Sequence, residues 1–438
     1  MPHLLVMDEI SCDALIVGNG PAGIKAALTL REKDPKIRIC IISRESLYFY
    51  SRPALMYVYM GSLRLEDTYP YEKNFWRKKN IWLLQDSVKL IDPQAKKAFT
   101  ERNQVISFQV CLLATGARPK ILPALGDIPR EVCYFTNLAD LKKLEELTHK
   151  PEQIKRAVVI GGGLIGVELA EMLSYRKIAV SFLVRENYFY PKALSEKEGR
   201  LVEKEICQHG VDLRLNCEVH AWHQEQGKLK GVVLANHSFL EAELACVAIG
   251  VESETELARN SHISCGEGIL VNPALQTEYP HIFAAGDAAE IVKGDTREQY
   301  FLWYTAEKMG RLAGENMYAY LKGLPLQDFE LGFWYNSAKF FRLDWQHFAL
   351  FPHLRQTERE IFFSFEQGNK LLRLIVEKET ISGMSALGLR LRERFCHQVL
   401  AEKRDVEYFL KNAQHAFFDP EFFPNYGKDL EKYALQEH

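Results

Sequence analysis

The 438-residue chain lacks several features that would assign it to common protein classes. No two of its nine cysteines have the C-x-x-C spacing of a zinc site or a thiol-redox motif, and most lie inside apolar runs such as residues 38–42. We therefore expect buried, reduced thiols in a cytoplasmic protein, with no disulfide framework and no metal site.

Long apolar runs and an excess of charge of one sign are also missing. No stretch reaches 18 consecutive apolar residues, so we expect no membrane-spanning helix, and residues 1–12 lack the basic start of a signal peptide. The net charge of −3 gives no general basic face for nucleic acid. With 47% apolar and 26% charged residues, the composition is that of an ordinary globular protein, whose length predicts about two to four domains.

One sequence pattern occurs twice, at residues 13–30 and 156–173. Each copy has a short β-branched apolar run, a glycine cluster and a helix-forming segment, so we expect a strand at Ala14–Val17 and a helix at Ala22–Leu30 in the first. The glycines that fit G-x-G-x-x-G are Gly18, Gly20, Gly23, Gly161, Gly163 and Gly166. Such a turn lets the backbone approach a pyrophosphate and aims the free N–H groups of a helix N-terminus at it. The repeat therefore predicts an α/β chain with two dinucleotide-binding modules.

The residues expected to meet the ribose differ between the modules. After the second strand of the first module, Glu45 is the best carboxylate for an adenosine ribose, and Arg44 precedes it. In the second module, Val184 stands where a glutamate would favour NADH, and Arg185 follows. Arg185 either meets the 2′-phosphate of NADPH or is a solvated charge at a strand end. Glu168, near the start of the second helix, is either a site residue or an ordinary complement to the helix dipole.

Four motifs in one order resemble the two-dinucleotide-binding-domain flavoproteins of the pyridine nucleotide–disulfide oxidoreductase superfamily. They are GNGPAG, LLATGARP, VVIGGGLIGVELAEML and IFAAGDAAEI, and the resemblance covers about residues 10–325. It implies two Rossmann-like domains, with FAD on the first glycine turn and NAD(P)H on the second. The expected boundaries are 1–122 with 251–328 for FAD, 123–250 for NAD(P)H, and 329–438 for a C-terminal α+β interface domain.

The resemblance also implies roles for single residues. Asp287 would bind the ribityl hydroxyls of the flavin, Trp303 would approach its pyrimidine edge, and Glu168 would lie near flavin and nicotinamide. Glu168 and Arg52 are the expected catalytic residues. The residues expected to bind a cofactor are Gly18, Gly20, Pro21, Ala22, Gly23, Arg44, Glu45, Arg52, Pro53, Ala114, Thr115, Gly116, Gly161, Gly163, Leu164, Ile165, Gly166, Glu168, Arg185, Gly286, Asp287 and Trp303.

The segment SLYFYSRPALMYVYMGS (residues 46–62) has no cysteine. Disulfide reductases of the superfamily carry a Cys-x4-Cys pair at this point, whereas here no cysteine lies between Cys40 and Cys111. A thiol inside an apolar strand has a raised pKa and makes a poor relay. We therefore expect no disulfide-reducing chemistry.

The Arg52–Pro53 pair in this segment resembles the RPxLSK segments of rubredoxin, putidaredoxin and ferredoxin reductases and of nitrite reductase flavin domains. Met56 and Tyr57 stand where the serine and lysine of that motif would be. The alternative is that the tyrosines of the segment only pack a helix.

The resemblance implies an enzyme in which NAD(P)H reduces FAD and the electrons leave without a protein disulfide. We expect the acceptor to be an iron–sulfur or rubredoxin-like protein. The alternatives are oxygen or a quinone-type molecule, or a redox-sensing protein resembling apoptosis-inducing factor. The aromatic-rich region after residue 329 is expected to form a core and a homodimer interface, with partner docking or a lid over the flavin as the alternative.

Overall fold

The computed structural model describes residues 9–122, 127–149, 154–350, 358–421 and 423–434. The chain divides into two compact units. Unit 1 contains residues up to 120, 136–146 and 250–331, and unit 2 contains residues 121–135, 147–249 and 332 onward. Unit 2 thus combines most of the expected NAD(P)H domain with the expected C-terminal domain, and the three-domain boundaries stay a prediction.

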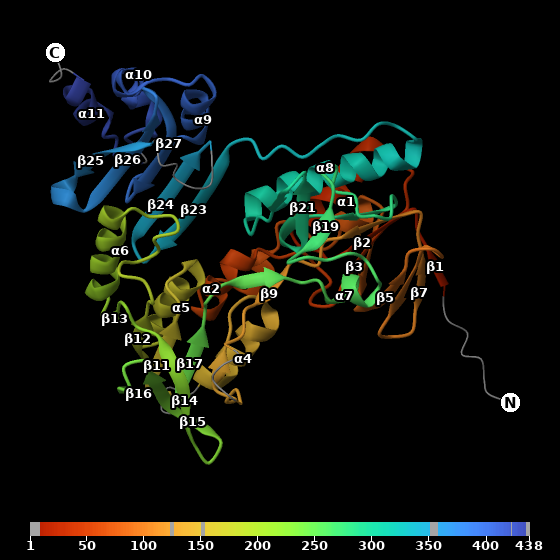
Figure 1. Ribbon diagram of the computed structural model, residues 1–438, viewed down its shortest axis with the longest axis horizontal. Helices are drawn as coiled ribbons and strands as arrows, with labels where there is room; N and C mark the ends of the chain where they lie inside the picture. The colour runs from red at the N-terminus through yellow and green to blue at the C-terminus, as the bar shows by residue number, and fades with distance from the viewer. Residues whose placement is uncertain (1–8, 123–126, 150–153, 351–357, 422, 435–438) are drawn as a thin grey trace. The chain divides into compact units, whose positions relative to one another are not determined.

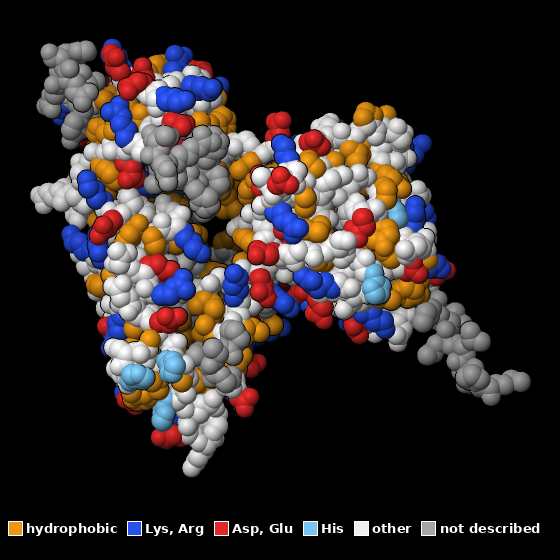
Figure 2. Space-filling model, viewed as in Figure 1, with side chains coloured by type: hydrophobic (Ala, Val, Ile, Leu, Met, Phe, Trp, Pro, Cys, Tyr) orange, Lys and Arg blue, Asp and Glu red, His pale blue; other side chains and the backbone are white. Residues whose placement is uncertain are grey.

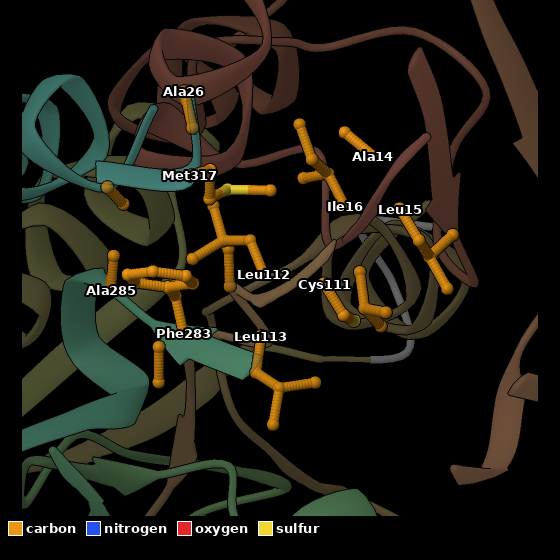
Figure 3. Packing of buried hydrophobic residues seen from close by; sticks show 14 of the residues in the cluster. Ala14, Leu15, Ile16, Ala26, Cys111, Leu112, Leu113, Phe283, Ala285 and Met317 are labelled. Atoms are coloured by element: carbon orange, nitrogen blue, oxygen red, sulfur yellow. The ribbon is translucent and has the colours of Figure 1, made fainter. Parts of the chain in front are cut away.

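A five-stranded parallel sheet forms the centre of unit 1 (Figure 1), in the order β20-β8-β2-β3-β4. Its strands are Ile282–Ala284, Val110–Leu113, Ala14–Val17, Ile39–Ser43 and Ile81–Gln85. Every residue of β2, β3 and β8 is buried, as expected for strands covered on both faces. Figure 3 shows part of this core, in which Leu15, Leu112 and Phe283 come from three neighbouring strands. The predicted strand Ala14–Val17 is confirmed.

Two helices of unit 1 pack closely against each other. They are α1 (Pro21–Lys33) and α8 (Trp303–Lys322). A Cβ at Gly310 of α8 would lie 2.3 Å from the carbonyl oxygen of Ala22, so only glycine allows this approach. The predicted helix at the first glycine cluster is confirmed, and α8 begins at Trp303.

The remaining strands of unit 1 form smaller sheets. They are ordered β1-β7-β6-β5, β19-β21-β22 and β18-β9. Their bounds are Glu9–Ser11, Val105–Ser107, Lys97–Thr100, Val88–Asp92, Ile269–Val271, Ala289–Lys293, Thr296–Glu298, Val251–Ser253 and Ala117–Pro119. The shorter helices are α2 (Leu55–Tyr59), α3 (Phe75–Lys78), α4 (Leu138–Thr148) and α7 (Glu256–Asn260).

Unit 2 has its own five-stranded parallel sheet, in the order β10-β17-β11-β12-β13. The strands are Val132–Cys133, Leu244–Val247, Arg156–Ile160, Ala179–Leu183 and Asp212–Arg214. Helix α5 (Leu164–Tyr175) follows β11, and α6 (Glu196–Gln208) follows β12. The residues between β13 and β17 form a three-stranded antiparallel sheet of β14 (Val219–Glu225), β15 (Lys228–Leu234) and β16 (Phe239–Glu241).

The C-terminal part of unit 2 is a five-stranded antiparallel sheet followed by three helices (Figure 1). The sheet order is β23-β24-β27-β26-β25, with bounds Trp334–Phe340, Leu343–Ala349, Thr380–Leu387, Lys370–Glu377 and Arg359–Phe365. The helices are α9 (Glu393–Ala401), α10 (Val406–Lys411) and α11 (Gly427–Ala434). Aromatic residues from both parts, including Phe348, Phe409 and Phe417, are fully buried in one cluster. The expectation that this aromatic-rich region forms a core is confirmed.

Surface and hydropathy agree with the composition. In the described part of the chain, no helix is long and apolar enough to cross a membrane. On the face shown in Figure 2, lysine and arginine side chains alternate with aspartate and glutamate side chains in both units. That face therefore carries no field of a single sign.

Candidate dinucleotide sites

The first glycine turn joins β2 to α1 and leaves no room for side chains at two positions. Gly18 has a φ of +110°, and a Cβ there would lie 2.0 Å from the carbonyl oxygen of Ala114. A Cβ at Gly23 would lie 2.0 Å from the carbonyl oxygen of Gly18. Gly20, the N-cap of α1, is different, because a Cβ there meets nothing within 4 Å and no side chain caps the helix. The open space and the uncapped N–H groups fit a pyrophosphate.

The second glycine turn joins β11 to α5 and has the same geometry. Gly161 has a φ of +117°, and a Cβ there would lie 2.3 Å from the carbonyl oxygen of Ala248. Gly163 is the N-cap of α5, again with open space and no side-chain cap. By contrast, α6 is capped by the side chain of Ser195. A missing side-chain cap is not particular to the glycine turns, since α8 and α9 also lack one. At Gly20 and Gly163 it is combined with open space at the helix N-terminus, and that combination suits an anionic ligand at each turn.

The A-T-G strand end follows β8 and is tied to residue 254. Thr115 donates a hydrogen bond from Oγ1 to the carbonyl oxygen of Glu254 (2.7 Å), and the N–H of Glu254 donates to the carbonyl of Gly116 (2.9 Å). The carboxylate of Glu254 also forms an ion pair with Arg44 at 3.2 Å. The structure thus brings Arg44 and the A-T-G segment together through Glu254, a residue that sequence reasoning missed.

Glu45 lies after β3 and is the centre of a polar cluster. Its Oε2 accepts from Arg52 Nη2 at 2.8 Å, and its Oε1 accepts from the hydroxyl of Tyr50. Oε1 also accepts from the backbone N–H of Leu138 at 2.8 Å. Burial opposes ionisation, but the charge and hydrogen bonds of Arg52 hold the pKa of Glu45 below its ordinary value.

Because these donors occupy both carboxylate oxygens, the geometry gives Glu45 a second role, that of fixing Arg52. Binding of an adenosine ribose by Glu45 stays a prediction. Arg52 is held further by its Nη1, which donates to the hydroxyl of Tyr50 (2.9 Å) and to the carbonyl of Thr136 (3.1 Å). The Tyr50-x-Arg52 spacing could have suggested part of this cluster, whereas no local signal pointed to Thr136 or Leu138.

Asp287 follows β20 in a short 3-10 helix, Gly286–Ala288, where Gly286 has a φ of +75°. Burial raises the pKa of the half-buried Asp287 carboxyl to about 6, while the positive charge of Arg52 opposes that rise. Its own backbone N–H donates to this carboxyl, but no side chain among the described residues does, so it can accept further hydrogen bonds from sugar hydroxyls. Trp303, at the first position of α8, packs on Phe49 with ring centroids 5.7 Å apart.

Glu168 lies in α5, two residues after the second glycine turn. Burial, and to a smaller extent the charge of Glu171, raises the pKa of Glu168 to about 8. The side chain is therefore mostly neutral near pH 7, and it has no ion-pair partner among the described residues. A carboxyl with a perturbed pKa beside a ligand-binding turn is a candidate functional group.

Arg185 stands at the end of β12, where its side chain is 72% exposed and contacts Glu186 at 3.4 Å. Val184 before it is fully buried, and its Cγ1 would lie 2.6 Å from a Cβ at Gly162. The side chain of Val184 thus packs directly against the backbone of the glycine turn. Of these two residues, only Arg185 is charged and exposed to solvent.

Six of the nine cysteines are buried, as the apolar runs around most of them suggested, whereas Cys207 is exposed and Cys217 and Cys265 are partly exposed. Cys40 is buried in β3, where burial raises its pKa to about 12, and Cys111 lies in the core of the same sheet (Figure 3). Residues 52–59 form a 3-10 turn and α2, in which Met56 and Tyr59 are buried. The two tyrosines Tyr50 and Tyr59 do pack the segment, but Tyr50 also binds Glu45.

Comparison with known proteins identifies the family. Residues 12–310 match the model of the pyridine nucleotide-disulphide oxidoreductase family. The chain belongs to this family. Membership makes it an FAD-dependent NAD(P)H oxidoreductase, with FAD and NAD(P)H as its cofactors.

Several curated relatives match over much of the chain. It is 30% identical over 279 residues to nitrite reductase [NAD(P)H] of Bacillus subtilis, covering 63% of this chain and 34% of the relative. It is 30% identical over 320 residues to human apoptosis-inducing factor 3 (70% and 51%), and 29% identical over 277 residues to rubredoxin-NAD(+) reductase of Pseudomonas putida (63% and 71%). The chain thus spans about a third and about half of the first two relatives.

Among solved structures, the fold matches that of a covalent putidaredoxin reductase–putidaredoxin complex. The TM-score is 0.77 at 20% identity, covering 97% of this chain and 99% of that chain. This match confirms the predicted α/β fold class.

Proposed function

We propose that this oxidoreductase takes electrons from NAD(P)H into bound FAD and delivers them to a small redox protein of the iron–sulfur or rubredoxin type. The observation that carries the proposal is the composition of residues 46–62, where Arg52 is fixed by Glu45 and no thiol is present. The nearest preceding cysteine, Cys40, is buried with a pKa raised to about 12, so it supplies no thiolate. Electrons therefore leave without a protein disulfide.

The residues of the two turns divide the work of binding. The glycine turn at α1 receives the FAD pyrophosphate, and the carboxyl of Asp287 accepts from the sugar hydroxyls. The glycine turn at α5 receives the pyrophosphate of NAD(P)H. When bound, FAD accepts two electrons from the nicotinamide and can release them one at a time, while the protein supplies position and electrostatics.

The relatives support a protein acceptor. One is named for the reduction of rubredoxin, and a structural neighbour is a reductase captured with putidaredoxin. The Arg52–Pro53 pair is the part of the chain that resembles the corresponding segment of such reductases.

Anaerobic stopped-flow spectroscopy on the FAD-loaded full chain tests the proposal. NADH or NADPH should bleach the flavin absorbance, and a rubredoxin or a [2Fe–2S] ferredoxin should restore it at least tenfold faster than oxygen or a soluble quinone does. Faster reoxidation by oxygen or quinone would replace the protein acceptor with a small molecule. Negligible turnover with every acceptor would support a redox-sensing role instead.

Alkylation tests the absence of a thiol relay. Cys207 is exposed on α6 and is the cysteine most open to iodoacetamide among those described. Its modification should leave both flavin reduction and reoxidation unchanged. A loss of reoxidation with retained reduction would point to a thiol in the electron path and overturn the proposal.

A further inference from the structure

The loop between β12 and α6 (residues 185–194) is the part of unit 2 that follows the second strand of the NAD(P)H sheet. In dinucleotide-binding folds this position meets the adenosine ribose. Two exposed cations lie on it, Arg185 and Lys192. The contacts that hold this loop in place therefore also set the positions of these two charges relative to the adenosine half of NAD(P)H.

One side of the loop is held by α6. The N–H of Phe189 donates to Oε1 of Glu203 at 2.8 Å, and the Phe189 side chain is fully buried. A Cβ at Gly199 would lie 2.8 Å from the carbonyl oxygen of Phe189, so the loop lies directly on the first turns of the helix. Tyr190 has a φ of +56°, which a non-glycine residue adopts only when its surroundings hold it there.

The other side of the loop is held by the C-terminal sheet. The ring of Phe189 meets that of Phe340 edge-on at 5.7 Å, and Tyr190 meets Trp345 at 6.4 Å. Arg373, on β26 between β27 and the edge strand β25, donates from Nη2 to the carbonyl oxygen of Ala193 at 3.1 Å. The C-terminal sheet thus contacts the loop at three residues, Phe189, Tyr190 and Ala193.

Arg373 is a buried cation, 1% exposed, whose position is set by two carboxylates. It pairs with Glu198 of α6 at 3.0 Å and with Glu360 of β25 at 2.6 Å, and Glu198 is fully buried. Ser385 donates to Glu198 at 2.5 Å and in turn accepts from Nε1 of Trp345 at 3.0 Å. Moving Arg373 would leave the fully buried carboxylate of Glu198 without its cation, whereas Glu360 is 30% exposed; the Glu198 pair therefore holds the guanidinium in place beside Ala193.

From this geometry we infer that Arg373 is a positioning residue for the adenosine half of NAD(P)H. It anchors residues 185–194 from the C-terminal sheet, so that the cations of the loop face the ribose and its 2′ substituent. The C-terminal domain thereby helps to determine nicotinamide nucleotide affinity although it has no nucleotide motif of its own. The inference rests on the proposed placement of NAD(P)H at the second glycine turn and does not depend on the acceptor.

Arg373→Met in the FAD-loaded full chain tests the inference by calorimetry with three probes. The Kd of 2′,5′-ADP and of 5′-AMP should rise about tenfold, within the range of long-range coupling effects. The Kd of reduced nicotinamide mononucleotide, which lacks the adenosine half, should stay unchanged. In stopped-flow experiments the NADH concentration giving half-maximal flavin reduction should rise, while the maximal rate stays the same.

Three further variants separate positioning from loss of folding. Arg373→Lys keeps the charge between Glu198 and Glu360 and should restore part of the affinity for 2′,5′-ADP. If Arg373→Met does not fold, Glu198→Gln combined with it removes one unpaired carboxylate and is used in the same assays. Arg390→Met breaks the exposed pair of Arg390 with Asp344 in the same domain and should change no probe.

An unchanged Kd for both adenosine probes would overturn the inference, and so would an equal loss of affinity for all three probes. Failure of the proposed nucleotide site has a different signature. In that case Gly163→Asp, which places a carboxylate at the second glycine turn, would bind 2′,5′-ADP normally.

Discussion

The two glycine turns have almost the same backbone but different surroundings. Gly18 and Gly161 both have φ near +115° (+110° and +117°), and each faces a carbonyl oxygen within 2.3 Å of where its Cβ would be. Both lead into helices without a side-chain cap. The turn itself is therefore a fixed device for an anion, and the difference between the sites lies elsewhere.

The difference lies at the ends of the neighbouring strands. After β3, the carboxylate of Glu45 accepts hydrogen bonds from Arg52, Tyr50 and the backbone N–H of Leu138. After β12, Val184 is buried, and Arg185 faces solvent with an exposed fraction of 72%. Both strand ends carry an exposed arginine, Arg44 at 65% and Arg185 at 72%, but only at the first does a carboxylate, that of Glu45, accept a hydrogen bond from a distant segment of the chain. This contrast fits a cofactor that stays bound at the first turn and one that exchanges at the second.

Placing a carboxylate in either turn should give the largest effect on cofactor binding. The two variants should lose different cofactors, NAD(P)H from the second turn and FAD from the first. The space at Gly20 and Gly163 admits a side chain, so aspartate acts there through its charge rather than by a clash. Gly163→Asp should lower the rate of flavin reduction by NAD(P)H about 100-fold, equivalent to about 2.7 kcal/mol, with FAD retained. Gly20→Asp should yield protein without flavin. Absorbance at 450 nm and stopped-flow reduction measure the two outcomes.

The alanine variants are the controls. Gly20→Ala and Gly163→Ala add a methyl group to open space without charge, so each should bind its cofactor within about threefold of the parent. Loss of FAD from Gly163→Asp, or normal reduction of that variant, would contradict the assignment of the two turns.

The next effect concerns acid–base behaviour at the second turn. Burial raises the pKa of Glu168 to about 8, against a reference value of 4.5. The folded state therefore binds a proton that the unfolded state releases between about pH 4.5 and 8, and this contribution to stability is lost as pH rises through that window. Glu168→Gln should remove the loss and raise the Tm by about 2–4 °C at pH 8.5, with little change at pH 5.

Thermal denaturation of FAD-loaded protein at several pH values measures this effect. Lys25 occupies the equivalent position after the first turn, so Lys25→Gln is the matched control and should leave the pH dependence unchanged. A parallel pH profile for Glu168→Gln and the parent would show that Glu168 ionises freely.

A smaller effect, on thermal stability, is expected from Glu45 at the end of β3. Glu45→Gln removes the charge that holds Arg52, whose side chain is 40% exposed. Because solvent screens a partly exposed pair, we expect a loss of about 1 kcal/mol and a Tm lowered by about 2–4 °C. Asp67→Asn breaks the more exposed pair with Arg64 and should shift the Tm less. An equal shift for both variants would mean that the Glu45 cluster has no special role.

The sequence predicted the repeated elements well because their signals are local. Strand Ala14–Val17, the helix after the first glycine turn and the buried Cys40 all follow from apolar runs and glycine positions within a few residues. The partners of Glu45 were missed for the opposite reason. Leu138 is 93 residues away, and the pairing of Arg44 with Glu254 spans 210 residues. Such contacts depend on how distant elements pack, and no periodicity encodes them.

The smallest effect should come from the open strand end at the second turn. Arg185 is 72% exposed, and its single ion pair with Glu186 is a weak one at 3.4 Å, so little in the protein competes with a 2′-phosphate. Arg185→Glu should raise the Kd of NADPH about fivefold and that of NADH less than twofold, since only NADPH carries the extra charge that is then repelled. Titration of flavin reduction with both nucleotides measures the ratio. Equal changes in the Kd of NADPH and of NADH would show that Arg185 is only a solvated surface charge. The second strand end would then differ from the first only in lacking a hydrogen-bonded carboxylate like that of Glu45.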